Sequence, residues 1–261
     1  MFIFFSTHHK TGTVFWKNLS RFISQRYNIK RVLYTDTLDL NDLKISSTEH
    51  KPIIIMDEDS RILEADLTNH EYIGVHSIRN PANIIYSATN YHLKGTEGLK
   101  GGERWLDEKR ANGFSYFESL KSFNNFSDQL NFELKNSSKY NIDRMYQVMN
   151  INNLYHVDID DISSDITMHN LKNLFYFLKI QIHLEITLND WINLTKKFCL
   201  WNLHYDNDNW VKKNSRHVTT KEPGIYLDNT IHFTDELKQS FKDEYGEDIY
   251  NDAFIIKKFI S

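Results

Sequence analysis

The chain has 261 residues, of which 40% are hydrophobic and 14% aromatic, and its formal net charge is −4 at pH 7. This hydrophobic content excludes a disordered chain, and the length suits one large α/β domain that covers residues 1–261. The acidic balance gives no support for a general nucleic-acid binder. The single cysteine, Cys199, excludes internal disulfides and a cysteine-based zinc site, and it is typical of a reducing compartment.

The sequence contains no membrane signal. No segment is apolar for long enough to span a bilayer, and residues 1–5 lack the basic leader of a signal peptide. We therefore expect a cytoplasmic protein that binds neither membranes nor nucleic acids. Asn, Ile and Lys are abundant, which is typical of an AT-rich genome and indicates a bacterial source.

The first strongly patterned stretch covers residues 2–16. Four apolar residues, Phe-Ile-Phe-Phe, predict a buried strand of a parallel sheet, and apolar residues recur at helical spacing from Thr13 onward. The polar turn between them contains Lys10 and one glycine. Because the N–H groups and the dipole of a helix start favour an anion, this turn is a candidate phosphate site.

The turn reads Lys10, Thr11, Gly12, Thr13, which differs from the P-loop pattern. No glycine lies five residues before Gly12, and the lysine precedes the glycine. The order Lys-Thr-Gly-Thr directly after a first strand resembles the 5′-phosphosulfate loop of the sulfotransferases. The alternative for this stretch alone is an ordinary strand-to-helix turn.

A second motif lies in residues 71–92, where a strand over 72–78 leads into a helix that begins at Pro81. Arg79 is expected at the carboxyl end of this strand and Ser87 two turns into the helix. Arg-Asn-Pro with a serine eight residues after the arginine resembles the 3′-phosphate-binding motif of the same family. Together the two motifs indicate a sulfotransferase of the soluble, cytosolic type that uses 3′-phosphoadenosine 5′-phosphosulfate (PAPS).

The rest of the chain alternates strands with helices, which predicts a central parallel β-sheet flanked by helices and joined by right-handed crossovers. The glycine-rich stretch 94–102 is expected to be a loop that borders the acceptor site, with a plain linker as the alternative. Further strands are expected at 31–35, 53–56 and 153–157, and helices at 60–67, 105–134, 171–178, 184–200 and 233–245.

The resemblance implies roles for the residues of the first motif. Lys10 would bind the bridging and sulfonate oxygens of the donor and offset charge as the phosphate leaves. The N–H groups that follow it, from Thr11, Gly12, Thr13 and Val14, would bind the 5′-phosphate together with a threonine hydroxyl. Phe15 occupies the place of a tryptophan that stacks on adenine in the family, and a core position is an equal alternative. Phe198 is a weaker candidate of the same kind.

The resemblance also assigns the 3′-phosphate to Arg79 and Ser87, because the planar fork of an arginine can bind two phosphate oxygens. In the family a late basic loop closes over the nucleotide. Here a loop with Arg216, His217 and Lys221 occupies that place but departs from the family pattern. Its alternative is a solvated basic loop.

The reaction needs a base for the proton of the acceptor. The third strand ends in Asp57, Glu58 and Asp59, and one of these carboxylates is the candidate; a helix-capping role is the alternative. His8 and His9 are rival bases. No metal site is expected from these histidines with His76, which is expected to be a packed core residue. Tyr91 and His92 lie one turn after Ser87 and are assigned to a plain helix surface, with a reach into the site as the alternative.

The predicted function is transfer of a sulfonate group from PAPS to a hydroxyl or amine of a small-molecule or glycan acceptor, without a metal. The product of the donor is adenosine 3′,5′-bisphosphate (PAP). Two alternatives are a nucleotide-dependent small-molecule kinase and a catalytically silent nucleotide- or glycan-binding protein of the same fold. The identity of the acceptor and the oligomeric state are left open.

Overall fold

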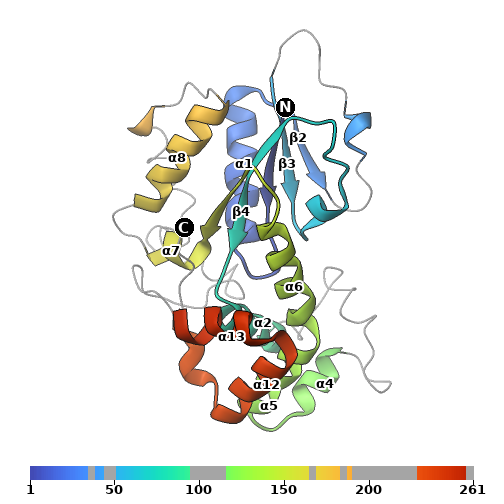
Figure 1. The fold of residues 1–261 in the computed structure, drawn as a ribbon, viewed down its shortest axis with the longest axis vertical. Helices are drawn as coiled ribbons and strands as arrows, with labels where there is room; N and C mark the ends of the chain where they lie inside the picture. The colour runs from blue at the N-terminus through green and yellow to red at the C-terminus, as the bar shows by residue number, and fades with distance from the viewer. Residues whose placement is uncertain are drawn as a thin grey trace.

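The computed structural model describes residues 1–34, 39–43, 51–94, 116–164, 169–182, 187–189 and 228–256. At its centre lies a sheet of five parallel strands in the order β2-β3-β1-β4-β5, with helices on both faces (Figure 1). The strands are β1 (Phe2–Ser6), β2 (Arg31–Tyr34), β3 (Ile53–Asp57), β4 (Tyr72–Ile78) and β5 (Leu154–Asp158). The predicted α/β fold is confirmed.

The helices follow the strands in alternation through the first half of the chain and gather after β4. In chain order they are α1 (Thr13–Tyr27), α2 (Pro81–Lys94), α4 (Tyr116–Ser122), α5 (Phe126–Lys135), α6 (Ser137–Met149), α7 (Ile159–Ser164), α8 (His169–Ile182), α12 (Asp235–Tyr245) and α13 (Glu247–Asn251). Short helical turns are η1 (Leu40–Asp42), η2 (Arg61–Glu64), η3 (Asn229–His232) and η4 (Asp252–Ile256). None of the helices described here is long and apolar enough to cross a membrane.

The central strand β1 is buried on both faces because successive side chains of a strand point to opposite sides. Ile3 and Phe5 pack in a core with α1 and α8. Phe2 and Phe4 point the other way and pack in a second core with Val148 of α6. Coverage of both faces explains why this strand reads as an unbroken apolar run instead of an alternating one.

The strand order places the first motif at the centre of the sheet. β1 lies between β3 and β4, and the register aligns Ser6 with Asp57 on one side and His76 on the other. Strands β2 and β3 lie on one side of β1, and β4 and β5 lie on the other. The end of β1 is therefore the point where the sheet divides into two halves. In open parallel sheets this switch point, beyond the carboxyl ends of the strands, is where ligands bind.

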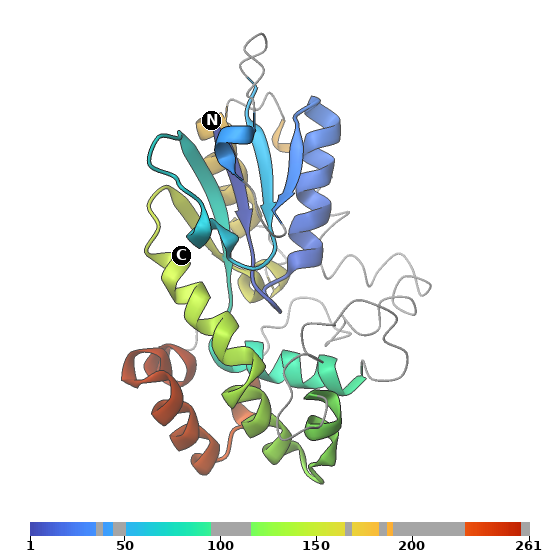
Figure 2. The same cartoon turned by 90° about the vertical axis from the view of Figure 1, so that its right-hand side faces the viewer.

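A helical layer lies beyond the carboxyl ends of the strands. Figures 1 and 2 show α2, α4, α5, α12 and α13 gathered on that side of the sheet, with α6 running back along it. Their apolar side chains form a third core that contains Ile84, Leu130, Ile142, Leu237 and Phe241. The carboxyl edge of the sheet thus faces packed helices.

Several expected elements match the structure closely. The strand at 72–78 and the helix start at Pro81 are confirmed. The observed bounds of the strand expected at 153–157 and of the helices expected at 171–178 and 233–245 lie within a few residues of the expected ones. The expected helix at 60–67 is only the turn η2, and the part of the 105–134 block that is described forms two helices. Helix α6 was not predicted, although Ile142, Met145 and Val148 repeat at helical spacing and are all buried. Nearly all of the helix expected at 184–200 and of the loop expected at 94–102 lies outside the described residues.

Candidate functional site

The turn after β1 is closed by its own hydroxyl groups. Thr11 Oγ1 accepts a hydrogen bond from His8 N at 2.9 Å and donates one to His8 O at 3.0 Å, and Thr13 Oγ1 also donates to His8 O, at 3.1 Å. Lys10 and Gly12 have positive φ angles of 68° and 84°. The hydroxyl groups of both threonines therefore stabilise the tight turn by hydrogen bonds to the backbone of His8.

Gly12 ends the turn and begins α1. It has a left-handed conformation and offers no side-chain cap. The first N–H groups of a helix have no partner within the helix, and the first turn of α1 contains no acidic residue. A Cβ atom at Gly12 would lie 2.6 Å from Ile159 Cγ1. The turn is therefore pressed against the start of α7 and presents an uncapped helix N-terminus.

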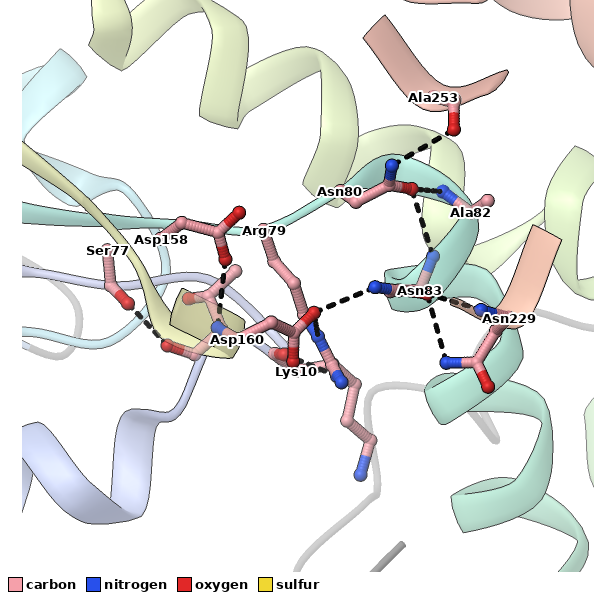
Figure 3. A network of polar contacts seen from close by, with 11 residues as sticks. Lys10, Ser77, Arg79, Asn80, Ala82, Asn83, Asp158, Asp160, Asn229 and Ala253 are labelled. Atoms are coloured by element: carbon pink, nitrogen blue, oxygen red, sulfur yellow. Dashed lines mark hydrogen bonds and ion pairs between the residues drawn. The ribbon is translucent and has the colours of Figure 1, made fainter. Parts of the chain in front are cut away.

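The second motif holds the first from the side of β4. Ser77 Oγ donates to Thr11 O at 2.5 Å, and Arg79 Nη1 donates to Lys10 O at 3.1 Å. Figure 3 shows both contacts, with the side chain of Lys10 extending away from Asp160. The structure thus brings together the two motifs that the sequence analysis singled out, at the carboxyl edge of neighbouring strands.

Arg79 is also part of a buried ion pair. Its Nε donates to Asp160 Oδ2 at 2.8 Å, and Asn83 Nδ2 donates to the same oxygen at 2.8 Å (Figure 3). Asn83 Oδ1 in turn accepts from Asn229 N at 3.1 Å. Burial, followed by the charge of Asp160, raises the pKa of Asp158 well above its ordinary value. Asp160 comes three residues after the strand expected at 153–157, and no pattern in the sequence connects it with Arg79.

The side chain of Lys10 is held by helix α2. Its Nζ lies 3.1 Å from the centre of the Tyr91 ring, a cation–π contact. Tyr91 is half-buried and lies near the end of the helix that begins just after Arg79. The C-terminal part of α2 therefore contacts the turn. Tyr91 does not lie on a plain helix surface.

The other residues of the two motifs are placed as follows. Phe15 is fully buried in the core against Trp16, with ring centroids 4.8 Å apart, which favours the core alternative over adenine stacking. Val14 is partly buried in the first turn of α1, and Ser87 is buried two turns into α2. Phe198, Arg216, His217 and Lys221 lie outside the described residues.

The carboxylates after β3 are engaged in structural contacts. Asp57 is fully buried and accepts hydrogen bonds from Ser6 Oγ at 2.7 Å and from the backbone N–H groups of residues 59, 61 and 62. Burial raises its pKa to about 6 against the effect of these hydrogen bonds. Glu58 pairs with Lys17 Nζ at 2.6 Å, and Asp59 is exposed. For Asp57 this geometry favours the capping alternative over the role of a base.

His8 belongs to a chain of histidine rings and not to the turn surface. Its Nδ1 contacts Ser60 Oγ, its Nε2 lies 2.6 Å from His76 Nε2, and His76 Nδ1 lies 2.9 Å from His156 Nδ1. Burial lowers the pKa of His8 to about 3, with a further contribution from Arg144, and lowers the pKa of the other two rings as well. These three histidine rings are therefore neutral near pH 7. The contacts between them argue against His8 as a base. His76 is a packed core histidine, as expected.

His92 was assigned to a plain helix surface, and this prediction is wrong. It is fully buried, and its Nδ1 lies 2.8 Å from Glu133 Oε2. The ring of His9 stacks on it, with centroids 5.2 Å apart and the planes inclined by 7°. Glu133 comes from α5, and no spacing signal in the sequence links it to His92. Within the described ranges, no group of three or more His, Cys, Asp or Glu residues could hold a metal ion.

The comparisons with known proteins point to one fold. No family model matches the chain, and no curated protein matches it in sequence. Among solved structures it is similar to the crystal structure of mouse sulfotransferase SULT7A1 complexed with PAP, at 12% sequence identity and a TM-score of 0.51. The match covers 95% of this chain and 86% of that chain. This likeness shows a shared sulfotransferase-like fold.

Proposed function

We propose that the protein is a sulfotransferase that transfers a sulfonate group from PAPS to a hydroxyl or amine of a small-molecule or glycan acceptor. The observation that carries this proposal is the hydrogen bond from Arg79 to the carbonyl of Lys10, at 3.1 Å. This hydrogen bond connects two parts of the site. One is the turn with Lys10 and the N-terminus of α1, and the other is Arg79 at the end of the neighbouring strand β4. A donor with a 5′-phosphosulfate and a 3′-phosphate requires two such anion sites close together.

The turn suits the 5′-phosphosulfate. Helix α1 begins at its end without a side-chain cap or an acidic residue in its first turn, so its dipole and N–H groups favour an anion. Lys10 adds a positive charge two residues before the turn's glycine. As the bond between phosphate and sulfonate breaks, charge grows on the bridging oxygen, and Lys10 would offset it.

Arg79 suits the 3′-phosphate, which does not change in the reaction. Its guanidinium can bind two phosphate oxygens at once. In the structure it is paired with Asp160, so the phosphate would share or replace this carboxylate. Ser87, which is buried two turns into α2, would add a hydroxyl group. The solved structure of similar fold was obtained with PAP, which supports a nucleotide of this kind.

The test compares the binding of PAP with that of AMP and ATP. Thermal denaturation and calorimetry measure the binding. PAP should stabilise the protein far more than AMP does, because only PAP has a phosphate for Arg79. At a PAP concentration of a hundred times its dissociation constant, the free energy of unfolding should rise by about 2.7 kcal/mol. Equal stabilisation by AMP would contradict a 3′-phosphate site, and preferential stabilisation by ATP would favour the kinase. Transfer from labelled PAPS to any acceptor then separates an enzyme from a silent binder.

A further inference from the structure

The buried pair of His92 and Glu133 has no role in the binding of the donor. Both side chains are completely buried, and Glu133 accepts hydrogen bonds from His92 Nδ1 at 2.8 Å, Tyr116 OH at 2.5 Å and Ser138 Oγ at 2.9 Å. Burial alone would raise the pKa of Glu133, but the charge of His92 and the hydrogen bonds outweigh it and lower the pKa. Glu133 is therefore an ionised acceptor, and Nδ1 of His92 carries a hydrogen.

The second ring nitrogen of His92 faces no such group. Nε2 is buried and makes no hydrogen bond to the residues that the structure describes. Buried polar atoms almost always have a hydrogen-bond partner, so an unsatisfied one indicates a group that the site is built to receive. With one hydrogen placed on Nδ1 by Glu133, the ring nitrogen of His92 that can accept a proton is Nε2. A carboxylate that orients a histidine in this way is the usual arrangement of a general base.

The position of His92 connects it with the transfer site. Residues 91 and 92 of α2 lie against residues 9 and 10 of the turn: the ring of His9 stacks on His92, and Lys10 Nζ lies over Tyr91. The start of the same helix carries Asn83, whose side chain donates to Asp160, the partner of Arg79. The buried ring of His92 therefore lies beside the turn that carries Lys10, the residue proposed to hold the sulfonate.

We propose that His92, oriented by Glu133, is the general base of the sulfonate transfer, an inference that rests on the function proposed above. The acceptor oxygen attacks the sulfur of PAPS, and a new S–O bond forms. The S–O bond to the bridging oxygen breaks, and its electron pair leaves with PAP beside Lys10. The acceptor proton moves to Nε2 of His92, and the carboxylate of Glu133 balances the charge of the imidazolium.

A purely structural ion pair between α2 and α5 is the competing explanation, and one substitution separates the two. In His92→Asn the side-chain amide nitrogen takes the place of Nδ1 and keeps the hydrogen bond to Glu133. The same substitution removes Nε2. A structural role is therefore largely retained, whereas a base is lost.

The experiment measures kcat for wild type and His92→Asn with labelled PAPS and two acceptors of similar size, 4-methylphenol and 4-nitrophenol. PAP affinity by calorimetry and the melting temperature should change little. With 4-methylphenol kcat should fall by roughly 10²–10⁴-fold, the usual contribution of a general base. With 4-nitrophenol the loss should be much smaller, because this phenol ionises near neutral pH without a base. His169→Asn, on the exposed surface of α8, is the control and should leave kcat unchanged.

Glu133→Gln tests the positioning role. Gln keeps a hydrogen-bond acceptor for Nδ1 but loses the charge, so kcat should fall while the KM for PAPS and the affinity for PAP stay near wild type. A change in KM and PAP affinity with kcat preserved would indicate a structural role instead.

The outcomes separate this inference from the proposed function. Normal turnover by His92→Asn, or an equal loss with both phenols, overturns the role of His92 and leaves the transfer reaction intact. A wild-type protein that binds PAP but transfers sulfonate to no phenol, alcohol or amine overturns both.

Discussion

Arg79 and Asp160, which lie 81 positions apart in the chain, form a buried ion pair with Nε and Oδ2 at 2.8 Å. The pair joins the end of β4 to the start of α7, and the guanidinium also reaches the turn after β1 through Lys10 O. The cation assigned to the 3′-phosphate is therefore already neutralised by a carboxylate in the protein itself. Binding of a phosphate has to be understood as competition with, or addition to, this contact.

The first prediction concerns Asp160→Asn. Loss of one member of a buried ion pair leaves an uncompensated charge and should destabilise the protein by roughly 3–5 kcal/mol. If the 3′-phosphate of PAP meets Arg79, it restores the missing charge, so PAP should raise the melting temperature of the variant more than that of wild type. The measurement is thermal denaturation with and without PAP, and Asp161→Asn, one residue further along α7, is the control. An equal or smaller shift in Asp160→Asn would place the phosphate elsewhere.

The second prediction concerns Lys10→Met, which removes the charge and keeps the side-chain length. Because Lys10 would stabilise charge that develops only in the transition state, kcat for PAPS turnover should fall by roughly 10²–10³-fold. PAP affinity should fall less, since the N–H groups at the start of α1 remain. Lys10→Arg should restore little activity, because a planar fork does not replace a compact ammonium group. Near-normal turnover by Lys10→Met would rule out this mechanism.

The third prediction uses the contact between Lys10 and the Tyr91 ring, at 3.1 Å from Nζ to the ring centre. Tyr91→Leu removes the aromatic face that holds the ammonium group, and kcat should fall by roughly 2- to 5-fold, the equivalent of an exposed cation–π contact. Tyr91→Phe keeps the face and should behave like wild type. A loss in Tyr91→Phe as large as in Tyr91→Leu would instead assign the effect to the hydroxyl group.

The fourth prediction tests the close approach at Gly12. Gly12→Ala should cost about 1–2 kcal/mol for a left-handed residue with a Cβ atom, and about 1–3 kcal/mol more for overlap with Ile159. The second part should disappear when Ile159 is already alanine. Urea denaturation of the two single variants and the double variant measures this coupling. Additive costs would mean that the turn moves away from α7 without penalty.

The fifth prediction concerns pH and His8. Since its pKa in the folded protein is about 3 against an ordinary value of 6.5, the unfolded chain binds more protons between these values. The stability contributed by neutral His8 is therefore present above pH 6.5 and is lost as the pH falls through that window. The stability advantage of wild type over His8→Asn should shrink by roughly 2 kcal/mol between pH 7 and pH 5.

Urea denaturation at the two pH values measures this difference. Comparison of variants is needed because Asp57, with a pKa raised to about 6, acts in the opposite direction in wild type and in the variant alike. His169→Asn, on the exposed surface of α8, should keep the wild-type pH dependence. A difference between wild type and His8→Asn that does not vary with pH would mean that His8 does not stay neutral in the folded protein.

The sequence by itself determined the local units of this protein. The apolar run before the turn predicted a strand buried on both faces, and the change to helical spacing at Thr13 predicted the start of α1. Pro81 predicted the start of α2 in the same way, which fixed Arg79 between a strand and a helix. These features could be predicted because each depends on residues within one element: an unbroken apolar run, apolar residues at helical spacing, and a proline at a helix start.

Only the tertiary structure decided which polar groups meet. Asp57 is the last residue of β3, a position typical of a base, yet its carboxylate accepts hydrogen bonds from the turn η2 that follows. His92 has the spacing of a helix surface but is buried against Glu133, and Arg79 is neutralised by Asp160. Periodicity shows which face of an element is buried, but the partner of a buried polar group depends on how separate elements cross. That crossing is set by strand order and helix packing, which no single stretch of the sequence contains.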